Sequence, residues 1–360
     1  MSHLGQEAMK KQLCVLFRVD AGRRLGNGHL MRCLALGKSL RSMGIRVVFV
    51  SRIESIDLKK RLRKEKISLV PMTRRRPGGE NDARDTNDVA RKWNASWIVV
   101  DGHQFTPSYQ RRLVGGAHRL MLIDDHGGAP SAADIILNQN LHARRALYVR
   151  AKKSILLLGP RHILLRSEFI AWRRWKRPIA VVGKRILITM GGSDSENATA
   201  KALQAVASLD LPLDIVVVLG EHYPYSKRLA ALARNVPHRV RIIKGTDRMA
   251  ALMAWADLGI STFGTTSWEL AYMGLPAVSL VVEAHQKTFA QAMARYGAIV
   301  KLDERDPFPA GFLRDAVNQA LQSPQSRKKM SRRGRALVDG LGNRRVLSAM
   351  GLSGKSRPKT

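Results

Sequence analysis

The chain has few cysteines and no long apolar run. Its only 2 cysteines are Cys14 and Cys33, so no disulfide framework is expected and a reducing compartment is predicted. No apolar run approaches the roughly 20 residues that span a bilayer. The first residues lack the apolar core of a signal peptide. We therefore expect a cytoplasmic protein without a membrane span.

Acidic residues are also scarce, because 28 Asp and Glu stand against 62 Lys and Arg, a net charge of +34. Such a positive field attracts nucleotides, acidic lipids or nucleic acid. Basic residues gather at 74–76, 172–177 and 327–333. The chain has no zinc finger, RNP motif or basic zipper, so we do not expect nucleic acid to be the partner.

Several nucleotide and metal signatures are missing as well. The turn at 26–31 lacks the third glycine of the dinucleotide fingerprint, and the next strand ends Val50-Ser51-Arg52 without an acid for a ribose. The P-loop motif is absent. His103, His126 and the pair at 124–125 have no regular ligand spacing. No nicotinamide or other cofactor and no metal ion are therefore expected.

The residues that are present alternate between apolar runs and polar or helical segments. This alternation predicts parallel sheets of βαβ type in two successive Rossmann-like halves, an α/β protein. The charged segment Trp172–Gly183, with Pro178, is typical of a linker between them. The expected strands are Leu13–Phe17, Val47–Val50, Ile67–Val70, Trp97–Val100, Leu120–Ile123 and Ile135–Leu137, then Ile186–Met190, Ile215–Leu219, Val240–Ile243, Leu258–Ile260 and Ala277–Val282.

A glycine-rich turn, Gly26-Asn27-Gly28-His29, separates the first strand from a predicted helix that begins near Leu30. In a parallel sheet, ligands bind at the carboxyl ends of the strands, where such a turn presents backbone N–H groups. Histidine is the side chain best suited to move protons near neutral pH. His29 is therefore a candidate catalytic base, although a residue at this position can also simply cap its helix.

Two later turns are candidates for holding a diphosphate. Gly264, Thr265 and Thr266 follow a predicted strand and open a helix. Glu269, in the first turn of that helix, either binds the two ribose hydroxyls or stabilises the helix dipole. The turn at 191–193 is either a second part of the cradle or an ordinary tight turn.

Several segments together carry a resemblance to a known family. They are Phe17–Gly22 with Gly26–Leu36, Val99–His103, Ile123–His126, Asn138–Leu141, Leu158–Arg161, Leu165–Phe169, Met190–Asp194, Gly264–Leu270 and Gly274–Pro276. In this order, from Leu13 to the region of Lys301, the chain resembles the UDP-2,4-diacetamido-2,4,6-trideoxy-β-L-altropyranose hydrolases of pseudaminic-acid biosynthesis. These enzymes are relatives of the MurG-type glycosyltransferases.

The resemblance implies a GT-B-like fold, in which two Rossmann-like domains face a cleft. We expect a sugar-binding domain over residues 1–177 with the catalytic His29, a UDP-binding domain over 178–340 and a basic tail over 341–360. The expected UDP-binding residues are Gly192, Ser193, Met249, Gly264, Thr265, Thr266 and Glu269, with Met249 touching uracil through its main chain. The expected sugar-binding residues are Asp20, Gly28, His103, Asn140, His285 and Gln286.

The resemblance also implies an activity. His29 would activate a water that cleaves a UDP-linked 2,4-diacetamido-2,4,6-trideoxy sugar to free sugar and UDP, in nonulosonate biosynthesis of the pseudaminic-acid type. Many relatives have Asn in place of His285 and Tyr in place of His103, so the sequence does not identify the sugar. It does not determine the oligomeric state either. The alternatives are a GT-B glycosyltransferase with a UDP-sugar donor and a nucleotide-sugar-binding or nucleic-acid-binding protein without turnover.

Overall fold

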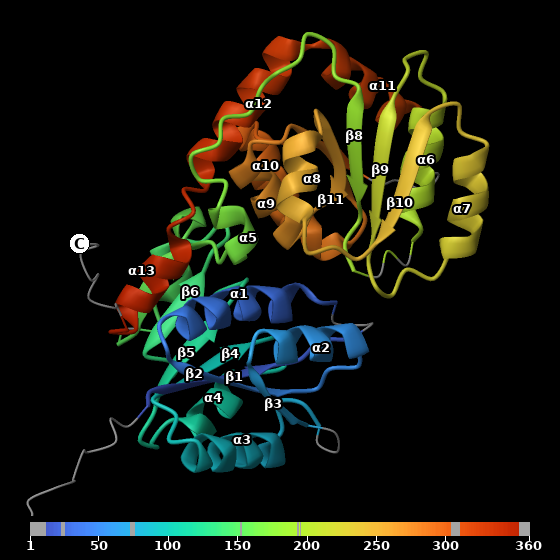
Figure 1. The fold of residues 1–360 in the computed structure, drawn as a ribbon. Helices are drawn as coiled ribbons and strands as arrows, with labels where there is room; N and C mark the ends of the chain where they lie inside the picture. The colour runs from blue at the N-terminus through green and yellow to red at the C-terminus, as the bar shows by residue number, and fades with distance from the viewer. Residues whose placement is uncertain are drawn as a thin grey trace, which may run out of the picture.

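The computed structural model describes residues 12–22, 26–72, 76–151, 153–192, 194, 196–303 and 310–352. It consists of two parallel sheets, each covered by its own helices, which form two lobes (Figure 1). The predicted fold class, two Rossmann-like α/β domains, is confirmed.

The first sheet has the strand order β3-β2-β1-β4-β5-β6-β7. Its inner strand β1 (Cys14–Val19) is buried along its whole length, as an inner parallel strand covered on both faces must be. Helices α1 and α2 cover one face, and α3 and α4 cover the other (Figure 1). The other elements are β2 (Arg46–Ser51), β3 (Ser68–Pro71), β4 (Trp97–Asp101), β5 (Arg119–Ile123), β6 (Ile135–Asn138) and β7 (Ile155–Leu158), with α1 (Gly28–Ser42), α2 (Ile56–Lys64), α3 (Glu80–Lys92), α4 (Pro107–Leu113), η1 (Arg145–Tyr148) and η2 (Pro160–His162).

The second sheet has the order β10-β9-β8-β11-β12-β13. Helices α8, α9 and α10 pack with one hydrophobic core, and α6, α7 and α11 pack with the other. Its elements are β8 (Arg185–Thr189), β9 (Asp214–Leu219), β10 (Arg239–Lys244), β11 (Leu258–Thr262), β12 (Ala277–Val281) and β13 (Val300–Asp303), with α6 (Ala198–Ala207), α7 (Ser226–Arg234), α8 (Met249–Trp255), α9 (Thr265–Met273), η3 (Ala284–Gln286), α10 (Lys287–Tyr296), α11 (Ala310–Gln322) and α12 (Pro324–Leu337).

The chain crosses between the lobes twice. The short helix α5 (Ser167–Ile170) packs with the second lobe, and Phe169 is part of its core. After α12, helix α13 (Gly342–Ala349) returns to the first lobe, where Val346 and Leu347 complete the core beside α1. The described part of the predicted basic tail therefore contains a packed helix. The domain boundaries expected at residues 177 and 340 stay predictions.

Two strands, β7 and β13, were missed by the sequence analysis. Each has only 4 residues and lies at an edge of its sheet. Edge strands are partly exposed, so β13 reads as an alternation of apolar and polar residues instead of a buried apolar run. Within the described residues, no helix has both the length and the apolar character needed to cross a bilayer.

Candidate functional site

A cleft of about 1790 Å³ lies between the two lobes. Its lining residues come from segments that follow strands of both sheets, so the carboxyl ends of the two sheets face one another across it. This is where open α/β sheets bind their ligands. The lining segments follow β1, β4, β5 and β6 in the first lobe and β8, β9, β11 and β12 in the second.

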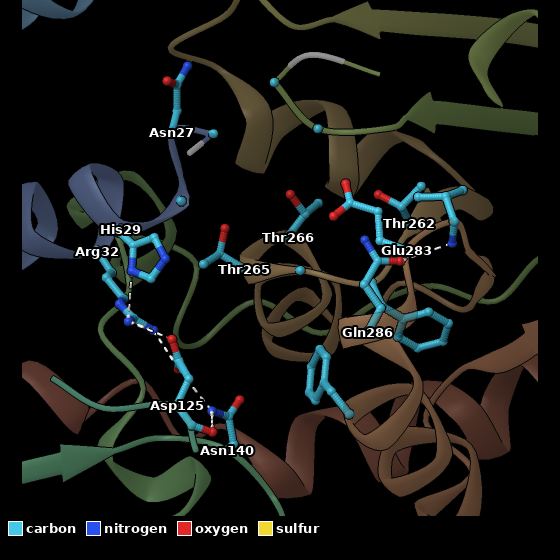
Figure 2. A pocket seen from close by; sticks show the side chains of 18 of the residues that line it. Asn27, His29, Arg32, Asp125, Asn140, Thr262, Thr265, Thr266, Glu283 and Gln286 are labelled. Carbon is cyan, nitrogen blue, oxygen red and sulfur yellow. Dashed lines mark hydrogen bonds and ion pairs between the residues drawn. The ribbon is translucent and has the colours of Figure 1, made fainter. Parts of the chain in front are cut away.

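The two lobes approach each other closely at three turns. A Cβ atom on Gly28 would lie 3.6 Å from the Thr265 side chain, and one on Gly192 would lie 3.6 Å from the Asn27 side chain. Figure 2 shows Asn27 and His29 on one side of the cleft and Thr265 and Thr266 on the other. Glycines at these points let the backbones of facing turns come together around a ligand.

His29 contacts a buried carboxylate on the neighbouring strand. Its Nδ1 lies 2.7 Å from Oδ1 of Asp101, at the carboxyl end of β4. Nδ1 also lies 3.1 Å from Nη2 of Arg32, which can only donate a hydrogen bond. Because the contact with the carboxylate is shorter and needs a proton on Nδ1, we assign that proton to the bond with Asp101. The Nε2 atom then carries a free lone pair, the arrangement of a general base.

A buried ion-pair network supports this histidine. The Arg32 guanidinium donates two hydrogen bonds of 2.7 Å to Asp101 and two of 2.8 Å to Asp125. Burial alone would raise the pKa of Asp101, but Arg32 and then His29 hold that pKa below its usual range. The pKa of Asp125 is lowered against burial in the same way by Arg32. Both carboxylates therefore stay ionised, and Asp101 fixes the orientation of the His29 ring.

Further imidazoles line the first-lobe side of the cleft. The His103 ring lies 5.3 Å from the His29 ring and 4.9 Å from the His126 ring, measured between centroids. Burial, followed by the neighbouring His29 and His126, lowers the pKa of His103. Asn140, also in this wall, donates to Asp125 over 3.0 Å. This wall therefore places imidazole and amide groups, which can donate or accept hydrogen bonds, beside the candidate base.

The opposite wall is built on the turn between β11 and α9. Gly264 precedes the helix, its N–H lies 3.4 Å from Oγ of Ser267, and its carbonyl accepts from the N–H of Ser267 over 3.0 Å. Thr265 and Thr266 form the first turn of α9 and line the cleft. The helix N-terminus thus adjoins the cleft, where a helix dipole favours negative charge.

Most of the predicted site residues line this one cleft. They are Gly28, His29, His103, Asn140, Gly192, Gly264, Thr265, Thr266 and Gln286. Gln286 accepts a hydrogen bond from the N–H of Val282 over 3.1 Å. Ser193 lies outside the described residues. His285 is in η3, and its side chain lies outside what the structure describes.

Three predicted residues do not line the cleft. The Asp20 carboxylate is buried inside the first lobe, where it accepts hydrogen bonds from Arg18, from the N–H of Arg52 and from Gln104, so the structure does not bring it to the cleft. Met249 begins α8, and its side chain packs in the hydrophobic core that α8 shares with α9 and α10 in the second lobe. Glu269 accepts two hydrogen bonds from Arg166, of 2.7 and 2.9 Å, behind Thr265.

Asp101, Arg32 and Asp125 were not among the predicted site residues. A signal for Asp101 was available, because it ends the strand paired with β1, where it stands opposite Val19. Arg32 lies one helical turn after His29 and so shares its face of α1. Within the described residues, no group of three or more His, Cys, Asp or Glu side chains is arranged to hold a metal ion.

Residues 185–340 match the model of the glycosyltransferase family 28 C-terminal domain. The chain is 24% identical over 313 residues to the uncharacterized protein MJ1062 of Methanocaldococcus jannaschii, covering 84% of this chain and 62% of that protein. It is 28% identical over 209 residues to the spore coat polysaccharide biosynthesis protein SpsG of Bacillus subtilis, covering 58% and 61%. The chain thus spans about three fifths of the length of these relatives.

Solved structures agree on the fold. MurG of Acinetobacter baumannii has a TM-score of 0.66 at 17% identity, over 94% of this chain and 99% of that one. The spinosyn rhamnosyltransferase SpnG complexed with thymidine diphosphate has a TM-score of 0.60 at 17% identity, over 94% and 100%. These likenesses show the GT-B fold, and residues 185–340 are similar to a glycosyltransferase family 28 C-terminal domain.

Proposed function

We propose that this protein is an enzyme that breaks the anomeric bond of a UDP-sugar, with His29 as the general base. The observation that carries the proposal is the His29–Asp101 contact of 2.7 Å on the wall of an interdomain cleft. A histidine held through one nitrogen by a buried carboxylate has its other nitrogen available for a proton. If His29 only capped α1, its contact with Asp101 would have no explanation. The N-cap residue of α1 is Asn27, and its side chain makes no capping hydrogen bond.

In the proposed reaction, Nε2 of His29 takes the proton from a nucleophilic O–H as its oxygen attacks the anomeric carbon. Asp101 stabilises the imidazolium that forms, because its low pKa keeps it ionised. The C–O bond to UDP breaks and the diphosphate receives the electron pair. The N-terminus of α9 at Gly264–Thr266 stabilises that charge. A single displacement of this kind inverts the anomeric carbon.

UDP is proposed to bind mainly to the second lobe, through Gly192, Ser193, Gly264, Thr265 and Thr266. Met249 would contact uracil through its main chain. We propose that the Glu269 carboxylate binds the ribose hydroxyls. Each of its oxygens keeps a lone pair beyond the bond from Arg166, since a carboxylate offers about four acceptor sites.

The identity of the nucleophile separates two candidate functions. A single small ligand typically occupies a pocket of about 300–1,000 Å³. The cleft, of about 1790 Å³, has room for a second substrate beside a nucleotide sugar. This volume favours transfer to a hydroxyl of an acceptor. The second candidate is hydrolysis of a UDP-2,4-diacetamido-2,4,6-trideoxy sugar, supported by the resemblance around Gly26–Leu36, with Gly28, His103, Asn140, His285 and Gln286 about the sugar.

The test incubates the full chain with a panel of UDP-sugars in ¹⁸O-labelled water and follows UDP release and the mass of the sugar product. ¹⁸O in the free sugar identifies hydrolysis, whereas UDP release that requires an added saccharide identifies transfer. His29→Gln is expected to abolish either reaction and His118→Gln to change neither, because His118 contacts the carbonyl of Leu113 outside the cleft. UDP binding without turnover of any UDP-sugar would refute an enzymatic role.

A further inference from the structure

Two basic segments that are far apart in the sequence lie side by side on the second lobe. The interdomain linker runs along α12 before it enters β8 (Figure 1). At one end, Nη2 of Arg335 lies 3.3 Å from the carbonyl oxygen of Arg173. At the other end, Nη2 of Arg327 donates to the carbonyl of Ala180 over 2.6 Å. The basic clusters at 172–177 and 327–333 therefore form one surface.

This surface carries positive charge without any acid of its own. Neither residues 171–184 nor residues 324–337 contain Asp or Glu. Each segment exposes several of its basic side chains to solvent. We call this surface the α12–linker face and define it by the exposed basic residues Arg173, Arg174, Lys176, Lys328, Lys329 and Arg332. The chain has 62 basic and 28 acidic residues, and part of this excess of positive charge lies on the α12–linker face. No acidic residue of the same two segments neutralises it.

An apolar tip borders this face. The Val181 side chain is 80% exposed and Val182 is 38% exposed, in the part of the linker next to the start of α12. Arg327 holds that part in place, because its buried guanidinium donates to carbonyls of the linker and of the end of α11, at Ala180, Val181, Ala320 and Leu321. The valines are therefore presented to solvent by a fixed backbone instead of packing inward.

The aromatic residues of the linker are not available for stacking. Trp172 and Trp175 pack edge to face, with centroids 5.4 Å apart, and both pack against the second core. The Arg177 guanidinium lies 4.9 Å from the centre of the Trp175 ring. Proteins that bind single-stranded nucleic acid stack bases on free aromatic faces. A lipid surface, which has phosphate groups above apolar chains, matches basic side chains beside exposed valines better than a single-stranded nucleic acid does.

We propose that the α12–linker face docks this protein on an anionic lipid bilayer. The basic side chains would lie against headgroup phosphates, and Val181 and Val182 would enter the boundary between headgroups and acyl chains. The docking is peripheral and reversible, and it leaves the interdomain cleft open because none of these residues lines it. This inference is independent of the proposed reaction.

The experiment sediments the full chain with vesicles of phosphatidylcholine, with and without phosphatidylglycerol, at low and at high salt. We expect binding to the anionic vesicles only, weakened by salt through screening. The triple variant Lys328→Gln/Lys329→Gln/Arg332→Gln should lose roughly 100-fold in partitioning, because each basic side chain contributes about a factor of five at such a surface. Val181→Ser should also weaken binding.

A matched control removes the same charge from exposed positions on α3 and α4, as Arg84→Gln/Lys92→Gln/Arg111→Gln. It should retain most of the binding. Equal losses in the two triple variants, or binding to phosphatidylcholine alone, would overturn the proposal. So would tighter binding to a single-stranded RNA that the first triple variant abolishes. If the first variant melts early, Arg173→Gln/Arg174→Gln on the linker tests the same face.

Discussion

Replacing Asp101 by Asn tests the proposed base more directly than removing His29 itself. Asn has nearly the same shape but no charge, and its amide can donate a hydrogen bond to Nδ1 of His29. That bond favours the tautomer with its proton on Nε2, which can no longer accept one from the nucleophile. Turnover should therefore fall by about 10²- to 10⁴-fold, the usual contribution of a positioned general base.

The cost to stability can be bounded from the ion pairs. Breaking a buried pair by removing one partner costs about 3–5 kcal/mol. Arg32, however, keeps both of its 2.8 Å hydrogen bonds to Asp125. We expect Asp101→Asn to lower the free energy of unfolding by about 2–3 kcal/mol, no more than the lower limit of that range, because the Arg32 charge stays paired. UDP affinity should hardly change, since UDP is proposed to bind the other lobe.

The assay combines steady-state UDP release, calorimetry with UDP and a melting curve on the same preparation. Asp125→Asn is the control, because Asp125 contacts Arg32 and Asn140 without touching His29. It should lose comparable stability and much less turnover. A wild-type rate in Asp101→Asn with a lowered melting temperature would refute the orientation of His29 by Asp101. Equal loss of rate in both variants would do the same.

Three other variants test separate parts of the structure. Glu269→Ala should weaken UDP binding by about 1–3 kcal/mol, as expected for a lost charged hydrogen bond, and unchanged calorimetry would remove Glu269 from the site. Burial, with His29 and His126, lowers the pKa of His103, so the unfolded chain takes up a proton first as pH falls below about 6.5. The wild type should therefore lose stability between about pH 6.5 and the lower folded pKa, and His103→Gln should lose less; parallel melting curves across this range would contradict it. Leu347→Ala should cost about 2–5 kcal/mol in urea unfolding, and no loss would mean that α13 is detached from the first lobe.

The sequence predicted what depends on continuous apolar runs and on turn chemistry. Every expected strand exists to within a few residues, and the inner ones gave the clearest signal because inner parallel strands are apolar throughout. His29 and the turn at Gly264 were found because glycine and a following helix mark the carboxyl end of a strand. Strand β13 and the partners of Arg32 escaped, since exposure at the sheet edge breaks the apolar pattern of β13 and ion pairs between residues far apart in the sequence depend on tertiary packing. Strand β7 was missed although all four of its residues are apolar. Asp20 was expected at the sugar, but it is buried with Arg18, a pairing that their spacing of two residues along an extended segment could have indicated.

The return of α13 to the first lobe affects how the protein is made. Asn343 donates to the carbonyl of Ala35, 308 residues earlier, and Val346 fills the core beside α1. During synthesis, the first sheet and α1 leave the ribosome long before these residues exist. Domains usually fold as units from the N-terminus. Here the nascent first lobe must wait, with an apolar groove uncovered, until nearly the whole chain has been translated.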